Sequence, residues 1–170
     1  MSMKTILAAA VMATLAATVH TAPANAQATR TWVGGMGDDG NPCSRSSPCR
    51  KFAGAMSKTA VGGEVNCIDS GGFGALNITK SINIYCEGVA AGVLAAGTTG
   101  VTVNAPGAVV VLRGLDIEGS GTGVNGISFI DANELHVENC VIRDFRAGTA
   151  NGILFAPSAT SKLFVSDTVI

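Results

Sequence analysis

The runs Asn125-Gly126-Ile127-Ser128-Phe129 and Asn151-Gly152-Ile153-Leu154-Phe155 are near copies of one another, with their glycines 26 residues apart. Thr99-Gly100-Val101-Thr102-Val103 precedes the first of them by the same interval. A fixed period of this size indicates a stack of structural repeats. Each run alternates with period two and is rich in β-branched or aromatic residues, which favours strand over helix. We therefore expect each repeat to form one coil of an all-β solenoid, with equivalent residues stacked.

A second family of runs supports the same period. These runs start 28, 25 and 28 residues apart and are Ile82-Asn83-Ile84, Val110-Val111-Leu112, Leu135-His136-Val137 and Leu163-Phe164-Val165. Shortly after each of the last three runs comes a residue that tolerates a left-handed backbone, namely Gly114, Asn139 or Asp167. We predict a sharp corner between two strands at these positions.

The same alignment predicts which charged residues become neighbours. It places Arg113 beside Glu138 and Glu118 beside Arg143 on adjacent coils. Opposite charges facing each other across two strands contribute roughly 0.2 to 1 kcal/mol per pair. We interpret the four residues as a device that fixes register, and a catalytic constellation is the alternative interpretation.

The segment before the repeats has a different pattern. Thr31-Trp32-Val33 predicts a strand, residues 34–48 a loop, and residues 49–59 a short helix that ends at Gly62-Gly63. Phe52 and Met56 fall on one face of that helix, so it can cover the open apolar end of the first coil. We expect Trp32 to belong to this cap. The predicted organisation is a strand, a disulfide loop and a capping helix over 27–63, followed by β-helix coils over 64–170.

The N-terminus has the pattern of a secretory signal peptide. Lys4 precedes an uncharged apolar run over 6–19, and Ala24-Asn25-Ala26 supplies small residues at the cleavage site. A membrane anchor is the alternative, but the run is shorter than the ~20 residues needed to span a bilayer. We predict removal of residues 1–26, export to the periplasm or the extracellular space, and no membrane span.

The charge balance is close to neutral. The chain has 11 basic and 12 acidic residues, and removal of the signal peptide takes away one lysine. Such a surface lacks the basic excess that nucleic-acid binding requires, so we expect no nucleic-acid partner.

All five cysteines follow the predicted signal peptide. Cys43 and Cys49 lie close together in a polar loop, each directly after a proline, and we predict a disulfide between them. Cys67 and Cys86 lie on successive strand-like runs and are candidates for a second bridge, which leaves Cys140 as a buried apolar residue. A zinc site is disfavoured, because neither a Cys-x-x-Cys spacing nor a nearby histidine is present.

The opening of the mature chain resembles that of bacterial right-handed parallel β-helix proteins of the pectate-lyase-like superfamily. The resemblance covers about residues 31–87 and is carried by Trp32-Val33, Gly37 to Cys43, Pro48 to Phe52, Ala55, Gly62 to Val65, Gly71 to Gly74 and Ile78 to Ile82. It implies a right-handed, single-stranded solenoid with three parallel sheets. It carries over no mechanism, because one fold hosts many functions.

The sequence offers few candidates for chemistry. Asp38, Asp39 and Asn41 could supply oxygen ligands to calcium, although a solvated turn is the simpler interpretation. His136 alternates outward and lacks a paired nucleophile, so we interpret it as a surface residue. Enzymes that cleave acidic polysaccharides typically cluster carboxylates on one sheet, and no column here stacks two acids. We assign no catalytic residue and no cofactor.

Three functions remain open at this stage. The first is an exported β-helix that binds a glycan or an envelope partner through an elongated surface without catalysis. The second is a polysaccharide lyase or glycoside hydrolase with catalytic coils beyond residue 170, since residues 166–170 copy only the middle of a repeat. The third is a structural or adhesin-like surface module. An uncapped last coil would also allow self-association.

Overall fold

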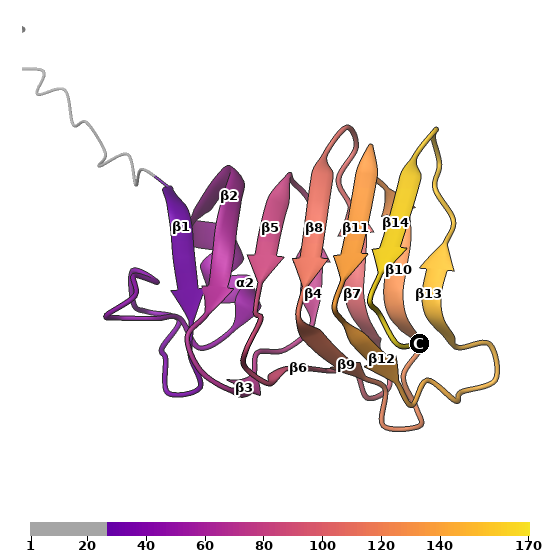
Figure 1. Ribbon diagram of the computed structural model, residues 1–170, viewed down its shortest axis with the longest axis horizontal. Helices are drawn as coiled ribbons and strands as arrows, with labels where there is room; N and C mark the ends of the chain where they lie inside the picture. Colours follow the sequence, from indigo (N-terminus) through magenta and orange to yellow (C-terminus); the bar gives the residue numbers. More distant parts are fainter. Residues whose placement is uncertain (1–26) are drawn as a thin grey trace, which may run out of the picture.

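The computed structural model describes residues 27–170, which form a parallel β-solenoid with three parallel sheets (Figure 1). The predicted signal peptide, residues 1–26, lies outside the described residues. One sheet has six strands in the order β1-β2-β5-β8-β11-β14, and the other two have four strands each, β13-β10-β7-β4 and β12-β9-β6-β3. The chain visits the sheets in turn, so that strands of successive coils lie side by side. The expected solenoid with three parallel sheets is confirmed.

The strands are short, and each coil bends after a few residues. Their bounds are β1 Ala28–Val33, β2 Thr59–Cys67, β3 Gly71–Gly72, β4 Leu76–Ile78, β5 Ile82–Tyr85, β6 Ala91–Leu94, β7 Thr99–Asn104, β8 Val109–Arg113, β9 Leu115–Glu118, β10 Asn125–Asp131, β11 Glu134–Glu138, β12 Val141–Arg143, β13 Asn151–Phe155 and β14 Lys162–Ser166. Within the described residues, one helix, α2, spans Phe52–Lys58.

The inward columns follow the predicted register. Ile127 of β10 pairs with Val101 of β7 on one side and with Ile153 of β13 on the other. In the six-stranded sheet, Leu135 lies between Val110 and Leu163 in the same manner. Because side chains on one face of neighbouring strands lie about 4.8 Å apart, these columns form a continuous apolar interior.

The repeated glycine has a steric reason. A Cβ atom added to Gly100 would lie 2.6 Å from Ile117 Cγ2 and 2.8 Å from the carbonyl oxygen of Gly126. The equivalent Gly126 faces Ile142 and the carbonyl oxygen of Gly152 even more closely. The glycines therefore let the isoleucine column of the β9-β12 sheet pack directly against the backbone of β7 and β10.

The corner after the six-stranded sheet has the predicted conformation. Gly114, Asn139 and Asp167 have φ angles of 73°, 50° and 48°, all in the left-handed region. Only glycine, asparagine and aspartate adopt this region readily, which explains why these residue types recur there. The turn sends the chain from β8 to β9 and from β11 to β12.

The capping helix is present but shorter than expected. It covers Phe52–Lys58 instead of residues 49–59, and Phe52, Ala55 and Met56 are buried. The Phe52 ring meets the Phe73 ring edge-on at 5.2 Å. The expectation that Gly62-Gly63 ends the helix is wrong, because both glycines lie within β2, which begins at Thr59. The expected boundary between residues 63 and 64 therefore falls inside that strand.

The side chain of Lys80 binds the C-terminal end of α2. Lys80 donates hydrogen bonds to the carbonyl oxygens of Met56, at 2.8 Å, and of Thr59. A cation at the C-terminal end of a helix is stabilised by the unsatisfied carbonyl groups there. Burial lowers the pKa of Lys80, so its ammonium group depends on these acceptors.

Both expected disulfides are present, Cys43–Cys49 and Cys67–Cys86. The first closes the loop that covers the outer edge of β1, where the Trp32 amide donates to the Cys43 carbonyl and the Gly34 amide to the Cys49 carbonyl. The loop thereby occupies the C-terminal part of this edge strand, which would otherwise be open to pairing with another chain. The second joins β2 to the residue after β5, and thus links two coils.

We predict that Gly126→Ala destabilises the solenoid by about 1–3 kcal/mol, the usual cost of forcing extra volume into a packed interior. Gly72→Ala is the control, because a Cβ atom at Gly72 meets nothing within 4 Å. Urea unfolding followed by circular dichroism measures both changes. Equal free energies of unfolding for the two variants would contradict the packing described above.

We also predict that native protein resists thiol alkylation and that denatured, unreduced protein takes up one alkyl group per chain. Cys140 is the free cysteine and is 1% exposed, and burial raises the pKa of its thiol. A protonated, buried thiol is unreactive. Intact-mass measurement with iodoacetamide tests this. Rapid labelling of the native state, or more than one label without reductant, would be inconsistent with the described cysteine pairing.

Candidate functional site

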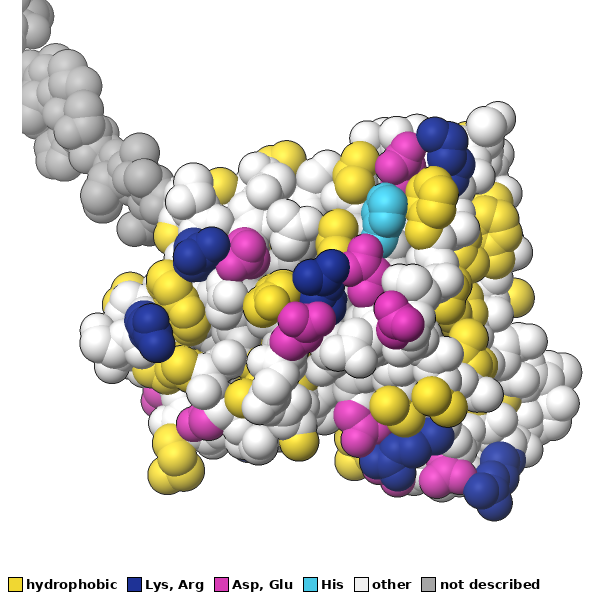
Figure 2. Space-filling view, viewed as in Figure 1, with side chains coloured by type: hydrophobic (Ala, Val, Ile, Leu, Met, Phe, Trp, Pro, Cys, Tyr) yellow, Lys and Arg dark blue, Asp and Glu magenta, His cyan; other side chains and the backbone are white. Residues whose placement is uncertain are grey.

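The outer side of the six-stranded sheet, which we call the ladder face, carries two in-register rows of mainly polar and aromatic side chains. The first row is Trp32, Asn66, Tyr85, Arg113, Glu138 and Ser166. The second row is Arg30, Glu64, Asn83, Val111, His136 and Phe164. Figure 2 shows this face, where positive and negative side chains lie next to one another.

Strand alternation places these side chains outside. Trp32 lies between the buried Thr31 and Val33, and His136 lies between the buried Leu135 and Val137. The expectation that His136 points outward is therefore confirmed. Trp32 belongs to β1, whose backbone bonds the cap loop, and its side chain lies on the ladder face. Tyr85 and Phe164 are 40% and 45% exposed, which makes them accessible to a partner.

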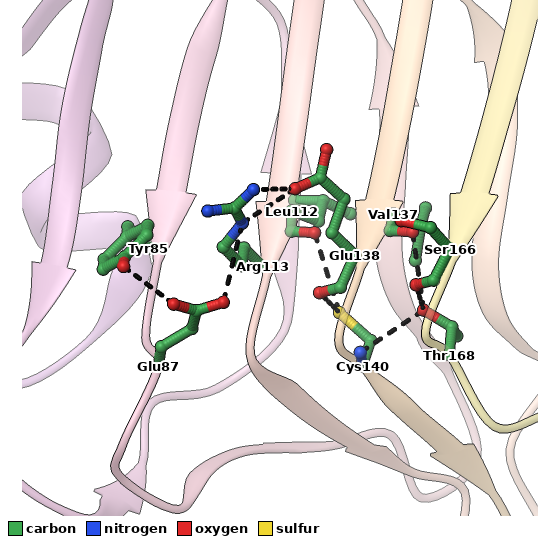
Figure 3. Close-up of polar contacts among 9 residues, drawn as sticks. All are labelled: Tyr85, Glu87, Leu112, Arg113, Val137, Glu138, Cys140, Ser166 and Thr168. Carbon is green, nitrogen blue, oxygen red and sulfur yellow. Dashed lines mark hydrogen bonds and ion pairs between the residues drawn. The ribbon is translucent and has the colours of Figure 1, made fainter.

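A connected polar cluster occupies the middle of the ladder face (Figure 3). The Tyr85 hydroxyl donates to Glu87 Oε2 at 2.7 Å, and Arg113 Nε lies 3.7 Å from Glu87 Oε1. The Arg113 guanidinium also donates two hydrogen bonds to Glu138 and lies 5.6 Å from the centre of the Tyr85 ring. The predicted Arg113–Glu138 pair is thus confirmed, within a larger cluster.

The cluster shifts the acid–base properties of its members. The hydrogen bond that Tyr85 donates to Glu87 raises the pKa of Tyr85, and the negative charge of Glu87 raises it further. The hydrogen bond to Glu138 raises the pKa of Arg113. At neutral pH the phenol is therefore protonated and the guanidinium charged.

A second cluster lies nearer the last coil. Lys162 Nζ donates to Glu134 Oε1 at 2.9 Å, and His136 Nε2 lies 3.3 Å from Glu134 Oε2. The His136 ring stacks on the Phe164 ring with centroids 4.6 Å apart. The only histidine among the described residues is held by a carboxylate and an aromatic ring, which keeps it in one orientation.

Another ion-pair cluster lies on the β12-β9-β6-β3 sheet. Arg143 lies 3.1 Å from Glu118, as the repeat alignment predicts. The same guanidinium also donates two hydrogen bonds to Asp116, at 3.0 and 2.9 Å. The alignment did not predict this second contact, because Asp116 pairs in register with Val141 and the arginine reaches it diagonally.

The remaining sheet presents a less charged surface. The outward row of β13-β10-β7-β4 is Asn77, Thr102, Ser128 and Leu154. These hydroxyl and amide groups do not titrate near neutral pH, so this row offers neither a general acid nor a general base.

The calcium candidates have structural partners in the cap loop. Asp39 Oδ1 accepts hydrogen bonds at 2.9 Å from the amides of Arg50 and Lys51, just before α2. Asp38 Oδ1 accepts the Gly40 amide at 2.7 Å. The ammonium group of Lys58 binds the carbonyl oxygens of Asp39 and Asn41, so the cation beside these oxygens is a lysine.

Two further observations concern the described residues as a set. Within residues 27–170, no group of three or more His, Cys, Asp or Glu side chains is arranged to hold a metal ion. Over the same range, no helix is long and apolar enough to cross a membrane.

Sequence reasoning missed Tyr85 and Glu87 as members of the central cluster. The alignment of repeats could have placed Tyr85 beside Arg113. Tyr85 follows Ile82-Asn83-Ile84 just as Arg113 follows Val110-Val111-Leu112. Glu87 lies beyond β5 in the corner, where coil length varies, so no alignment of repeats could place it.

We predict that Lys162→Met raises the pKa of Glu134. The hydrogen bond from Lys162, and then that from His136, lowers this pKa below the usual value of a glutamate. The pair therefore stabilises the fold above the unfolded-state pKa, and this contribution is lost as the pH falls through the lower folded value. Carboxyl ¹³C chemical shifts across a pH titration measure the change, with Lys51→Met as control. An unchanged Glu134 midpoint would show that Lys162 does not control it.

Comparison with known proteins identifies no significantly similar protein. The chain matches no protein-family model, and neither a curated protein nor a solved structure is significantly similar to it.

Proposed function

We propose that this protein is an exported, non-catalytic binding protein that presents the ladder face to an extended glycan of the cell envelope or its surroundings. One observation carries this proposal. The single tryptophan and single tyrosine of the chain, together with His136, all lie on the ladder face. Aromatic residues and arginine are enriched where proteins bind partners, because they offer large contact areas and directional hydrogen bonds.

The shape of the face supports an extended ligand. Six strands in register place equivalent side chains in straight rows along the solenoid axis, about 4.8 Å apart. Ion pairs between neighbouring strands hold the charged side chains of these rows in place. A preorganised row loses little conformational entropy on binding, which favours a polymer that contacts several coils at once.

Export and family membership form part of the same proposal. Two disulfides in a small domain are typical of proteins that fold in an oxidising compartment. We also propose that the chain is a divergent relative of the pectate-lyase-like β-helix proteins. Its three parallel sheets and its left-handed corner residues support this assignment. The enzymatic and adhesin-like alternatives remain predictions.

We predict that the protein, produced without residues 1–26, binds at least one polysaccharide on an array of cell-wall and envelope glycans. Tyr85→Ala combined with His136→Ala should abolish this binding, because it removes two planar groups from adjacent rows of the ladder face. The matched control, Thr102→Ala with Ser128→Ala, changes two outward residues of the β13-β10-β7-β4 sheet and should bind normally.

Two results would refute the proposal. One is the absence of binding to every glycan by folded protein, verified by circular dichroism. The other is binding that the control pair abolishes and the ladder-face pair leaves intact, which would move the site to another sheet.

A further inference from the structure

We propose that the ligand of the ladder face is a neutral polysaccharide, without uronate, sulfate or amino groups. This inference rests on the proposed function and narrows it to one chemical class. It follows from the way in which the charges and hydrogen-bonding groups of the face are already partnered.

The cations of the ladder face are neutralised within the protein. The pairs are Arg30 with Glu64 at 3.1 Å, Arg113 with Glu138 and with Glu87 at 3.7 Å, and Lys162 with Glu134 at 2.9 Å. Four carboxylates thus accompany three cations, which leaves a net charge of −1 with the histidine neutral. An acidic polymer would meet cations whose charge is already balanced by carboxylates, together with a small negative excess, so its binding is disfavoured.

Each of these carboxylates already accepts from at least one donor as well. Glu64 accepts from Asn66 at 2.7 Å in addition to its pair with Arg30, and Glu87 accepts from Tyr85. Glu134 lies within reach of both Lys162 and His136. A basic polymer would therefore compete with donors that are already in place, and exposed ion pairs exchanged in this way yield little free energy.

The groups that remain available suit hydroxyls. The Tyr85 hydroxyl uses its proton on Glu87, and its oxygen can also accept a hydrogen bond. Asn83 and Ser166 lie in the same two rows and can both donate and accept. A sugar hydroxyl also donates and accepts, so a chain of neutral sugars can pair with these groups without disturbing an ion pair.

The test measures retention of the folded protein in gels that contain one polysaccharide each, at low and high sodium chloride. Neutral galactan, glucan and mannan are compared with acidic polygalacturonate and basic chitosan. We expect retention by at least one neutral polymer, with an affinity that salt leaves unchanged, because no charges are brought together. Tyr85→Phe should weaken it about fivefold, the effect of one lost hydrogen bond. Ser128→Ala, which removes a hydroxyl from another sheet, should not.

The outcomes separate the two proposals. Salt-sensitive retention by polygalacturonate or chitosan alone would overturn the neutral ligand and leave glycan binding intact. No retention by any of the five polymers would overturn the neutral ligand, and the proposed function would also fall if the glycan array showed no binding.

A second variant tests the charge argument itself. Glu87→Gln with Glu138→Gln frees the guanidinium of Arg113, so this protein should gain salt-sensitive retention in polygalacturonate. Failure to gain it would contradict the role assigned to the ion pairs.

Discussion

Stacking of like side chains on successive coils, held by backbone hydrogen bonds between parallel strands, is the constraint on which the rest of this structure depends. Each strand is too short to be stable alone, and its apolar side chains are buried only because the next coil supplies their neighbours. A slip of one residue would turn Ile127 outward and Ser128 inward. The interior columns, the glycines at 26-residue intervals and the left-handed corners all maintain that register.

Much of this architecture could be predicted because equivalent residues of successive repeats occupy equivalent positions and become neighbours in a solenoid. Aligning the repeats was sufficient to pair Ile127 with Val101 and Ile153, and to place Arg113 beside Glu138. The segment before the repeats lacks that advantage, since nothing in the chain copies it. There the helix is shorter than expected, and the positive φ of Gly62 lies within a strand instead of at a helix end. Diagonal contacts, such as Arg143 with Asp116, depend on side-chain length and rotamer, which a column alignment does not contain.

The same register that builds the interior also arranges the outer surface. Residues separated by about 25 to 28 positions become neighbours, so single substitutions in each repeat can assemble a continuous face. On the ladder face this produces paired charges beside planar groups, held in straight rows. Ion pairs hold these groups in place before a partner arrives, which favours the proposed binding of an extended polymer. In the cap loop, in contrast, polar groups of Asp39 form hydrogen bonds that hold α2 in place.

The most direct test of the stacked coils is a methyl NOESY spectrum of protein labelled at Ile, Leu and Val methyl groups. The structure predicts that Ile127 shows cross-peaks to both Val101 and Ile153, since it lies between them in the sheet. It also predicts cross-peaks from Leu135 to both Val110 and Leu163. Cross-peaks from Ile127 only to residues near it in sequence would contradict the solenoid.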